Sequence, residues 1–333
     1  MSFEWPAYID FPTDLLSIAG WTLTWAIAHA LLHRLVIVPL SDQWFEVPTI
    51  LSLQSSTKLL DPSPQAAAKA APAAKAGLTQ RKKPARAKTE EAVAVSAEEL
   101  AAAVKSVNST KKKFRNAAWK CFVYAVSSVV GFVVLFSDSW WKDPSEWMLD
   151  YPDPTTALMK IYYNVGFGNY MYQTLSLITH PNQTDFLAMC MHHVSTVAVI
   201  TASYCFGFTR VGIVILLLHD CSDPIMEFAK CNLYLKKQKT ADNLFTLFAI
   251  VFIATRNILF PYVIRCSHIY SILEDGTRMP RGYSFWGNFC LGCLWVLAAL
   301  NFYWGFLIIK IAIKTVITGE VEGDIREADE DDD

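Results

Sequence analysis

Charged residues are scarce in this sequence. Asp, Glu, Lys and Arg make up 18% of its 333 residues, against about 25% in a typical soluble domain. Hydrophobic residues make up 53%, and the mean hydropathy is +0.26. This composition excludes a disordered chain and is not typical of a soluble enzyme. It indicates a membrane protein.

Three further absences narrow the kinds of site that the chain can hold. It has no GxGxxG or GxxxxGK[ST] stretch, so a nucleotide-binding fold has no local support. Its eight cysteines lie in or beside apolar runs and form no disulfide pattern, and the pair Cys290 and Cys293 is typical of helix packing. Its seven histidines are too few for a membrane di-iron oxygenase. We therefore expect neither a metal nor a bound cofactor.

The net charge of −2 hides two charged segments of opposite sign. Residues 55–116 hold 13 Lys/Arg against 5 Asp/Glu, and residues 319–333 hold 1 Arg against 9 Asp/Glu. The Ala/Lys/Pro-rich stretch Pro62–Lys88 has too few large apolar residues to fold alone, so we predict that it is disordered. The acidic tail, Glu320–Asp333, is expected to be flexible.

Apolar runs close to the length of about 20 residues that spans a bilayer recur along the rest of the chain. They predict an all-α integral membrane protein with about seven transmembrane helices. The third and fifth runs are marginal, because both contain polar residues. The runs are Leu15–Leu40, Ala117–Phe136, Thr155–Leu177, Asp185–Tyr204, Arg210–Phe228, Leu244–Ile264 and Phe285–Ile313.

The distribution of Lys and Arg predicts the orientation. With seven spans, three basic clusters fall on the same side, and the positive-inside rule makes this side the cytosol. The clusters lie at 111–115, 236–239 and 310–314, whereas the acidic loop Asp138–Asp153 lies on the opposite side. The N-terminus is therefore predicted to be lumenal and the C-terminus cytosolic.

Ionisable residues are concentrated in the fourth and fifth runs, where they mark a functional site by default. The fourth run contains His192 and His193, and the fifth contains Asp220 and Asp223. At 1.5 Å per residue, these residues lie roughly 10–15 Å from the cytosolic end of their helices. We expect the two imidazoles and two carboxylates to meet at one depth. Asp220, Asp223, Glu227 and Lys230 recur at three or four residues, so we expect them to stack on one face of the fifth helix.

Two kinds of chemistry suit this set. An imidazole can act as a nucleophile or general base, with a carboxylate to orient it and stabilise the imidazolium, which favours acyl or proton transfer. A metal site is the rival, since His and Asp also bind zinc and iron. It ranks lower because the pair His192 and His193 has no third histidine two or three residues upstream.

The order of these residues matches a known pattern. Residues 185–196 read DFLAMCMHHVST, and the motifs that follow are Ser203-Tyr204, Arg210-Val211-Gly212, HDCSD at 219–223 and EFAK at 227–230. The series resembles the Lag1 motif of ceramide synthases, a subgroup of the TRAM–LAG1–CLN8 (TLC) family. The resemblance covers roughly Lys113–Ile264. Pro224 is a departure from the pattern and is expected to kink the fifth helix beside the site.

The resemblance implies an organisation of the chain. It comprises an N-terminal segment with the first transmembrane helix (1–40), a basic and largely disordered cytosolic linker (41–112), a catalytic TLC domain (113–314) and an acidic cytosolic tail (315–333). Six of the helices would form a bundle around a lipid cavity. The implied location is the endoplasmic reticulum membrane.

The implied reaction is N-acylation of a sphingoid base (sphinganine, sphingosine or phytosphingosine) to a ceramide or dihydroceramide. Fatty acyl-CoA would be the co-substrate, and no cofactor is implied. The expected partners are acyl-CoA, the sphingoid base and membrane lipid; a homodimer or heterodimer is compatible with the resemblance, and nucleic acid is not expected. The alternatives are a non-enzymatic TLC protein that binds or transports lipid and a metal-dependent membrane lipid enzyme.

The resemblance assigns roles to the motif residues. The catalytic set is His192, His193, Asp220 and Asp223. One of the histidines would carry the acyl group or deprotonate the amine, and the aspartates would orient that histidine and the amine. The CoA headgroup would stay in water near Lys236, Lys237 and Lys239. The predicted substrate-binding residues are Asp185, Thr196, Ser203, Tyr204, Arg210, His219, Ser222, Glu227 and Lys230.

Overall fold

A computed structural model describes residues 10–45, 85–148, 155–179, 185–272 and 284–318. Every regular element in these ranges is a helix, which confirms the all-α prediction. The predicted acidic tail from residue 319 and the greater part of the predicted disordered segment, 62–84, lie outside the described residues. The chain divides into two compact units, Leu40–Lys113 and the remainder, and each is described by itself.

The unit Leu40–Lys113 contains most of α2 (Val38–Trp44) and the first part of α5 (Ala85–Phe136). The Lys111 ammonium lies 3.1 Å from the Asp42 carboxylate. We expected the linker 41–112 to be largely disordered, but it is helical from Ala85 onward. Ala, Glu and Lys dominate this part of the linker, and all three are strong helix formers.

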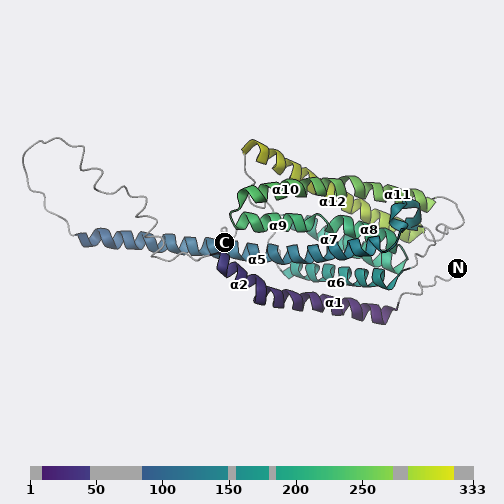
Figure 1. The fold of residues 1–333 in the computed structure, drawn as a ribbon, viewed down its shortest axis with the longest axis horizontal. Coiled ribbons are helices and arrows are strands. Elements are labelled where there is room, and N and C mark those ends of the chain that lie inside the picture. The colour runs from purple at the N-terminus through teal and green to yellow at the C-terminus, as the bar shows by residue number, and fades with distance from the viewer. Residues whose placement is uncertain (1–9, 46–84, 149–154, 180–184, 273–283, 319–333) are drawn as a thin grey trace, which may run out of the picture. The chain divides into compact units, whose positions relative to one another are not determined.

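The other unit is a bundle of long helices (Figure 1), in which consecutive long elements run in opposite directions. α8 and α9 follow each other end to end, as do α10 and α11. Two short 3₁₀ turns, Trp140–Lys142 and Pro144–Met148, follow α5. The bounds are α1 (Phe11–Leu32), α6 (Ala157–Thr179), α7 (Phe186–Cys205), α8 (Thr209–Asp220), α9 (Asp223–Tyr234), α10 (Gln238–Phe252), α11 (Phe260–Ile272) and α12 (Ser284–Thr318).

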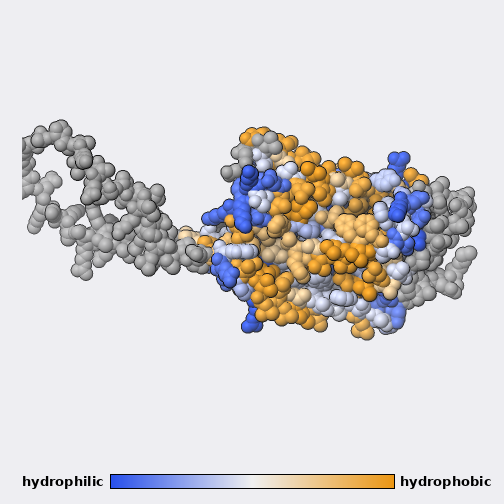
Figure 2. Space-filling view, in the orientation of Figure 1, coloured by the Kyte–Doolittle hydropathy of each residue, from blue (hydrophilic) through white to orange (hydrophobic). Residues whose placement is uncertain are grey.

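The surface of this bundle is apolar. Figure 2 shows hydrophobic residues over its middle and hydrophilic residues toward its two ends. Side chains such as Leu187 and Phe306 are 73% and 67% exposed, which water would disfavour and lipid accommodates. Five helical stretches are long and apolar enough to cross a bilayer: Pro12–Trp44, Ala101–Phe136, Phe186–Cys205, Gln238–Ile269 and Phe285–Thr315. The chain is therefore a multi-pass membrane protein.

Two of the predicted spans, the third and the fifth, are not among these five stretches. They are the two that we identified as marginal because of their polar residues. α6 carries Lys160, Asn164 and Asn169, which lower its hydropathy. α8 and α9 have 12 residues each, so neither crosses a bilayer alone. The exact number of seven spans stays a prediction.

The fifth span is interrupted beside the site, as expected from Pro224. Pro224 has no N–H for the carbonyl of Asp220, four residues earlier, and its ring would clash with that carbonyl. α8 accordingly ends at Asp220, and α9 begins at Asp223. The Asp220 carbonyl instead accepts a hydrogen bond from the Ser128 hydroxyl of α5 (3.1 Å). The break thus turns a backbone carbonyl toward a neighbouring helix.

Two π-helical turns have a similar origin. η1 (His33–Ile37) ends two residues before Pro39, and η4 (Ile253–Leu259) ends two residues before Pro261. A wider turn accommodates the hydrogen bond that each proline removes. Because η4 contains the buried Arg256, its widened turn helps to place a cation in the bundle.

Polar contacts hold α1 against its neighbours. Near its start, the buried Asp14 lies 2.8 Å from the Lys160 ammonium and accepts a hydrogen bond from the Tyr204 hydroxyl (3.1 Å). Further along, the Trp25 indole donates to the carbonyl of Val165 (3.2 Å). These contacts fix the register of α1 on α6.

The contact between α1 and α6 also needs a glycine. A Cβ at Gly168 would lie 2.7 Å from Cβ of Trp21 and 2.9 Å from the backbone nitrogen of Thr22, whereas one at Gly166 would meet nothing within 4 Å. We predict that Gly168→Ala lowers the unfolding free energy by about 1–3 kcal/mol through overpacking. Gly166→Ala should leave it unchanged or slightly raised, since alanine favours helix. Thermal unfolding in detergent compares the two; equal midpoints would contradict the close contact.

Candidate active site

Three imidazoles meet inside the bundle. His192 and His193 lie on α7, and His219 lies in the last turn of α8. The ring of His192 is 5.8 Å from that of His193 and 6.4 Å from that of His219, measured between centroids. The predicted meeting of the fourth and fifth spans therefore includes His219, which we had placed among the substrate-binding residues.

The two aspartates do not orient these rings in the way we expected. Asp223 Oδ1 accepts a 2.6 Å hydrogen bond from Arg256 Nη2, and Asp220 Oδ2 accepts one from the Ser127 hydroxyl. In the part of the chain that the structure describes, neither carboxylate forms a hydrogen bond to His192 or His193. The aspartates instead connect the break of the fifth span to η4 and α5.

Arg256 is the main residue that sequence reasoning missed. Its Nη2 also donates to the carbonyl of His219, and its guanidinium lies 4.9 Å from the centre of the Phe252 ring. One side chain therefore joins the end of α8 to the start of α9. The sequence did contain a sign of this role, because an arginine inside an apolar run requires a charged or polar partner within the membrane.

His219 is held at both ring nitrogens. Its Nδ1 lies 2.8 Å from the carbonyl of Ile215, which can only accept, so Nδ1 carries a proton. Its Nε2 lies 3.0 Å from the Asn301 amide nitrogen on α12. The edge of the ring packs against Phe260, with centroids 4.6 Å apart. These contacts make His219 a fixed element of the site.

The other two histidines differ from each other. The Thr174 hydroxyl donates to the carbonyl of Tyr170 (2.7 Å), so it accepts the hydrogen bond from His193 Nδ1, 3.0 Å away. Nδ1 of His192, by contrast, is buried without a hydrogen-bond partner among the described residues. Its ring packs 5.5 Å from that of Trp304. His192 is half-buried, and its enclosed Nδ1 is a ring nitrogen whose lone pair or proton no described residue engages.

α12 supplies two residues outside the Lag1 motif. Asn301 and Trp304 are three residues apart, so they lie on one helix face. The Trp304 indole donates to Asp185 Oδ2 (3.1 Å), which gives Asp185, a predicted substrate-binding residue, a structural partner beside His192. The uniformly apolar pattern of α12 did not reveal its inward face; an isolated asparagine in such a run was the available signal.

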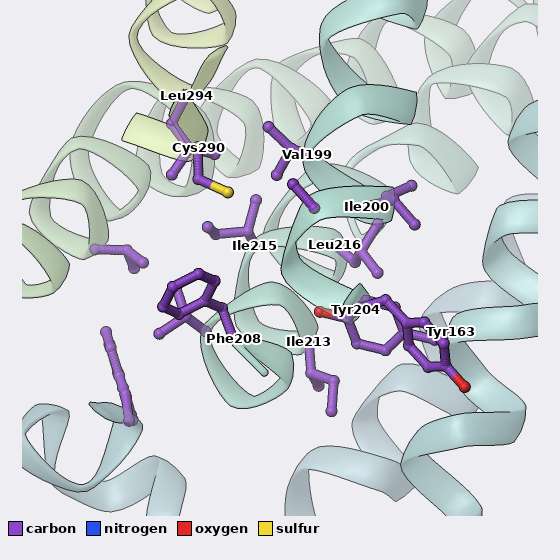
Figure 3. Packing of buried hydrophobic residues seen from close by; sticks show 14 of the residues in the cluster. Tyr163, Val199, Ile200, Tyr204, Phe208, Ile213, Ile215, Leu216, Cys290 and Leu294 are labelled. Atoms are coloured by element: carbon purple, nitrogen blue, oxygen red, sulfur yellow. The ribbon is translucent and has the colours of Figure 1, made fainter. Parts of the chain in front are cut away.

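A small cavity lies between α6, α7, α8 and α12. Its walls are largely aliphatic, and Figure 3 shows several of these side chains, including Val199, Ile215 and Leu216, in the packed interior. Thr196 and His219 make part of the lining polar, and Thr196 is one helical turn from His192. The lining residues are Tyr163, Tyr170, Thr196, Val199, Ile200, Ser203, Gly212, Ile215, Leu216, His219 and Leu297. Thr196, Ser203 and His219, all predicted to bind substrate, thus share one cavity.

Two predicted substrate-binding residues instead hold the fold. Tyr204 bonds to Asp14 of α1, and Arg210 donates to the backbone carbonyl of Glu146 (2.7 Å). Tyr204 lies 12 residues along α7 from His192, roughly 18 Å at the helical rise, and Arg210 lies at the start of α8, nine residues before His219. The structure does not bring them to the imidazoles.

The remaining three lie at or beyond the break in the fifth span. The Ser222 hydroxyl donates to Asp223 Oδ1 (3.1 Å), and Ser222 is fully buried. Glu227 and Lys230 form a 3.4 Å ion pair on α9, with both side chains largely buried. No group of three or more His, Cys, Asp or Glu side chains within the described ranges is arranged to hold a metal ion.

These features define a class: an all-α membrane protein with a buried cluster of His, Asp and Arg beside an apolar cavity. The family model described as the TLC domain, which covers TRAM, LAG1 and CLN8 proteins, matches residues 113–310. The match includes more than half of the chain. The chain belongs to the TLC domain family.

Similar proteins occur in animals and plants. The chain is 33% identical over 230 residues to "Ceramide synthase 4" of Mus musculus, covering 68% of this chain and 57% of that protein. It is 31% identical over 239 residues to "Ceramide synthase LOH1" of Arabidopsis thaliana, covering 68% and 76%. It is 34% identical over 237 residues to "Alternaria stem canker resistance protein 1" of Solanum lycopersicum, covering 66% and 75%. The chain thus spans little more than half the length of the mouse relative.

The pair of Arg256 and Asp223 should be strongly coupled. We predict that Arg256→Met and Asp223→Asn each lower the unfolding free energy by about 3–5 kcal/mol, because each leaves one buried group without its partner. The double variant should lose clearly less than the sum. A double-mutant cycle in detergent measures the coupling, with the exposed Lys239→Met as a neutral control. Strictly additive losses would contradict a direct pair.

Proposed function

We propose that this protein is a ceramide synthase, which transfers a fatty acyl group from acyl-CoA to the amine of a sphingoid base. The observation that carries the proposal is His192, a half-buried imidazole whose enclosed Nδ1 has no hydrogen-bond partner among the described residues, one helical turn from the Thr196 side of an apolar cavity. Relatives in animals and plants that bear the name ceramide synthase support it.

The arrangement assigns a part to each group. The acyl chain enters at the small cavity, whose aliphatic walls move apart to admit it. His192 reacts at the thioester, and the buried Thr196 hydroxyl, which has no hydrogen-bond partner among the described residues, is available to the thioester oxygen. The C–S bond breaks, a C–N bond to the amine forms, and CoA leaves as the thiol with a proton from the amine. His193, Asp220 and Asp223 hold the helices that carry the reacting group.

The hydrophilic part of acyl-CoA needs a site in water. Lys236, Lys237 and Lys239 are exposed where α9 joins α10, and their charges attract phosphates. The same proposal makes residues 113–314 the catalytic domain and places it in the endoplasmic reticulum membrane. It also makes the N-terminus lumenal and the C-terminus cytosolic. No bound cofactor enters the reaction.

Amide synthesis by purified protein tests the proposal. Wild-type protein in detergent with palmitoyl-CoA and sphinganine should form dihydroceramide, detected by mass spectrometry. We predict that His192→Ala lowers the rate at least about 100-fold, the scale expected when a nucleophile or base is lost. The exposed His268→Ala on α11 is the matched control and should keep wild-type activity. Lipid binding without amide synthesis by the wild type would favour a carrier and contradict an enzyme.

Intact-protein mass separates the two routes open to His192. If the imidazole is the nucleophile, palmitoyl-CoA alone should add one palmitoyl group to wild-type protein and none to His192→Ala. If the imidazole is the base, no adduct forms and amide appears only when sphinganine is present. Either route requires His192; an active His192→Ala protein would exclude both.

A further inference from the structure

A buried polar atom beside the imidazoles has no partner. Asn301 is fully buried in α12, yet its side-chain oxygen Oδ1 accepts no hydrogen bond from the described residues. Buried amide oxygens are nearly always paired, and an unpaired one in a membrane helix is unfavourable. A ligand that donates the missing hydrogen bond to this oxygen would explain it.

The orientation of the Asn301 amide follows from its neighbour. The carbonyl of Ile215 requires a proton on His219 Nδ1, so Nε2 of the neutral ring is an acceptor. Asn301 must therefore direct its NH₂ group to Nε2, as the 3.0 Å contact shows. The oxygen then points away from His219 and is left unpaired. This arrangement leaves an acceptor, rather than a donor, open at the site.

An unpaired acceptor such as Asn301 Oδ1 can bind only a substrate group that donates a hydrogen bond. The reacting thioester group offers only acceptor atoms, its carbonyl oxygen and sulfur, and cannot satisfy Asn301 Oδ1. An amine offers N–H donors. Among the other buried polar atoms without a partner in the described residues, Nδ1 of His192 and Oγ1 of Thr196 lie on α7, which packs against α12, and Oδ1 of Asn257 lies on η4. The two atoms on α7 are suited to the thioester, whereas Asn301 Oδ1 is suited to the amine.

We propose that Asn301 binds the attacking amine of the long-chain base through Oδ1 while its Nδ2 fixes His219. The inference rests on the proposed acyltransferase function and adds a binding residue from outside the Lag1 motif. It places the amine on the α12 side of the imidazoles and the thioester on the α7 side. The amine N–H donates to Oδ1, and its lone pair remains free to attack the acyl carbon.

Two variants test the separate roles of the side-chain oxygen Oδ1 and nitrogen Nδ2 of Asn301. Asn301→Leu removes both hydrogen bonds and keeps the branch at Cγ, and Asn301→Asp keeps an acceptor oxygen but loses the donor to His219. Asn301→Leu should raise the KM for sphinganine at least roughly tenfold, as expected for one lost buried hydrogen bond, and change the KM for palmitoyl-CoA less than about twofold. Asn301→Asp should restore the KM for sphinganine while kcat stays low, because His219 is no longer fixed.

A matched control lies on α9. Asn232 is also a buried helical asparagine, and its amide donates to the carbonyl of Phe228 (2.8 Å) rather than to an imidazole. Asn232→Leu should leave both KM values unchanged. If Asn301→Leu does not fold, Asn301→Ala makes the same loss without added volume.

A substrate lacking one hydroxyl identifies the bound group. With 1-deoxysphinganine, the penalty of Asn301→Leu should persist, because the amine is still present. Disappearance of the penalty would show that Oδ1 binds the 1-hydroxyl and would overturn the inference, as would equal changes in the KM of both substrates or a change in kcat alone. Wild-type protein that forms no amide from any acyl-CoA would instead refute the acyltransferase function, and with it this inference.

Discussion

The site depends on how one arginine compensates for a broken helix. Pro224 interrupts the predicted fifth span and leaves the Asp220 carbonyl without its helical donor at the end of α8. Arg256 enters from the π-helical turn η4 and binds both the His219 carbonyl and the Asp223 carboxylate, so the two halves are joined at a fixed angle. An unpaired Arg or Asp would be costly at this depth, so each stabilises the other. The position of His219, and of the residues packed on it, follows from this pair.

Around the contact of Arg256 with α8 and α9, polar side chains and apolar side chains occupy separate surfaces. α12 contributes Asn301 and Trp304, which hold His219 and Asp185, while α7 contributes His192 and Thr196, whose buried polar atoms are unpaired among the described residues. The aliphatic residues of α7 and α8 line the cavity that begins next to them. The unpaired polar atoms of α7 therefore lie next to an apolar surface, an arrangement that suits the amphipathic substrates of the proposed reaction.

The membrane class and the approach of the fourth run to the fifth were predictable because they depend on local patterns. Runs of apolar residues indicate helices whatever their neighbours, and His192 and His193 in such a run indicate function. The partners of Asp220 and Asp223 were not predictable. The three-to-four-residue spacing implies a shared face only in an unbroken helix, and Pro224 removes that condition. Arg256, Asn301 and Trp304 reach the site through contacts between helices 37 to 119 residues apart in sequence. The contact of Tyr204 with Asp14 was not predictable for a related reason, because Asp14 lies on the first helix.

The most direct test of the central claim is an experimental structure with a thioether analogue of a long-chain acyl-CoA, which cannot transfer its chain. The account predicts density for the chain in the cavity lined by Val199, Ile215 and Leu216, with the sulfur-bearing carbon next to His192 and Arg256 still bound to Asp223. A chain bound on the outer surface of the bundle, away from His192, would contradict it.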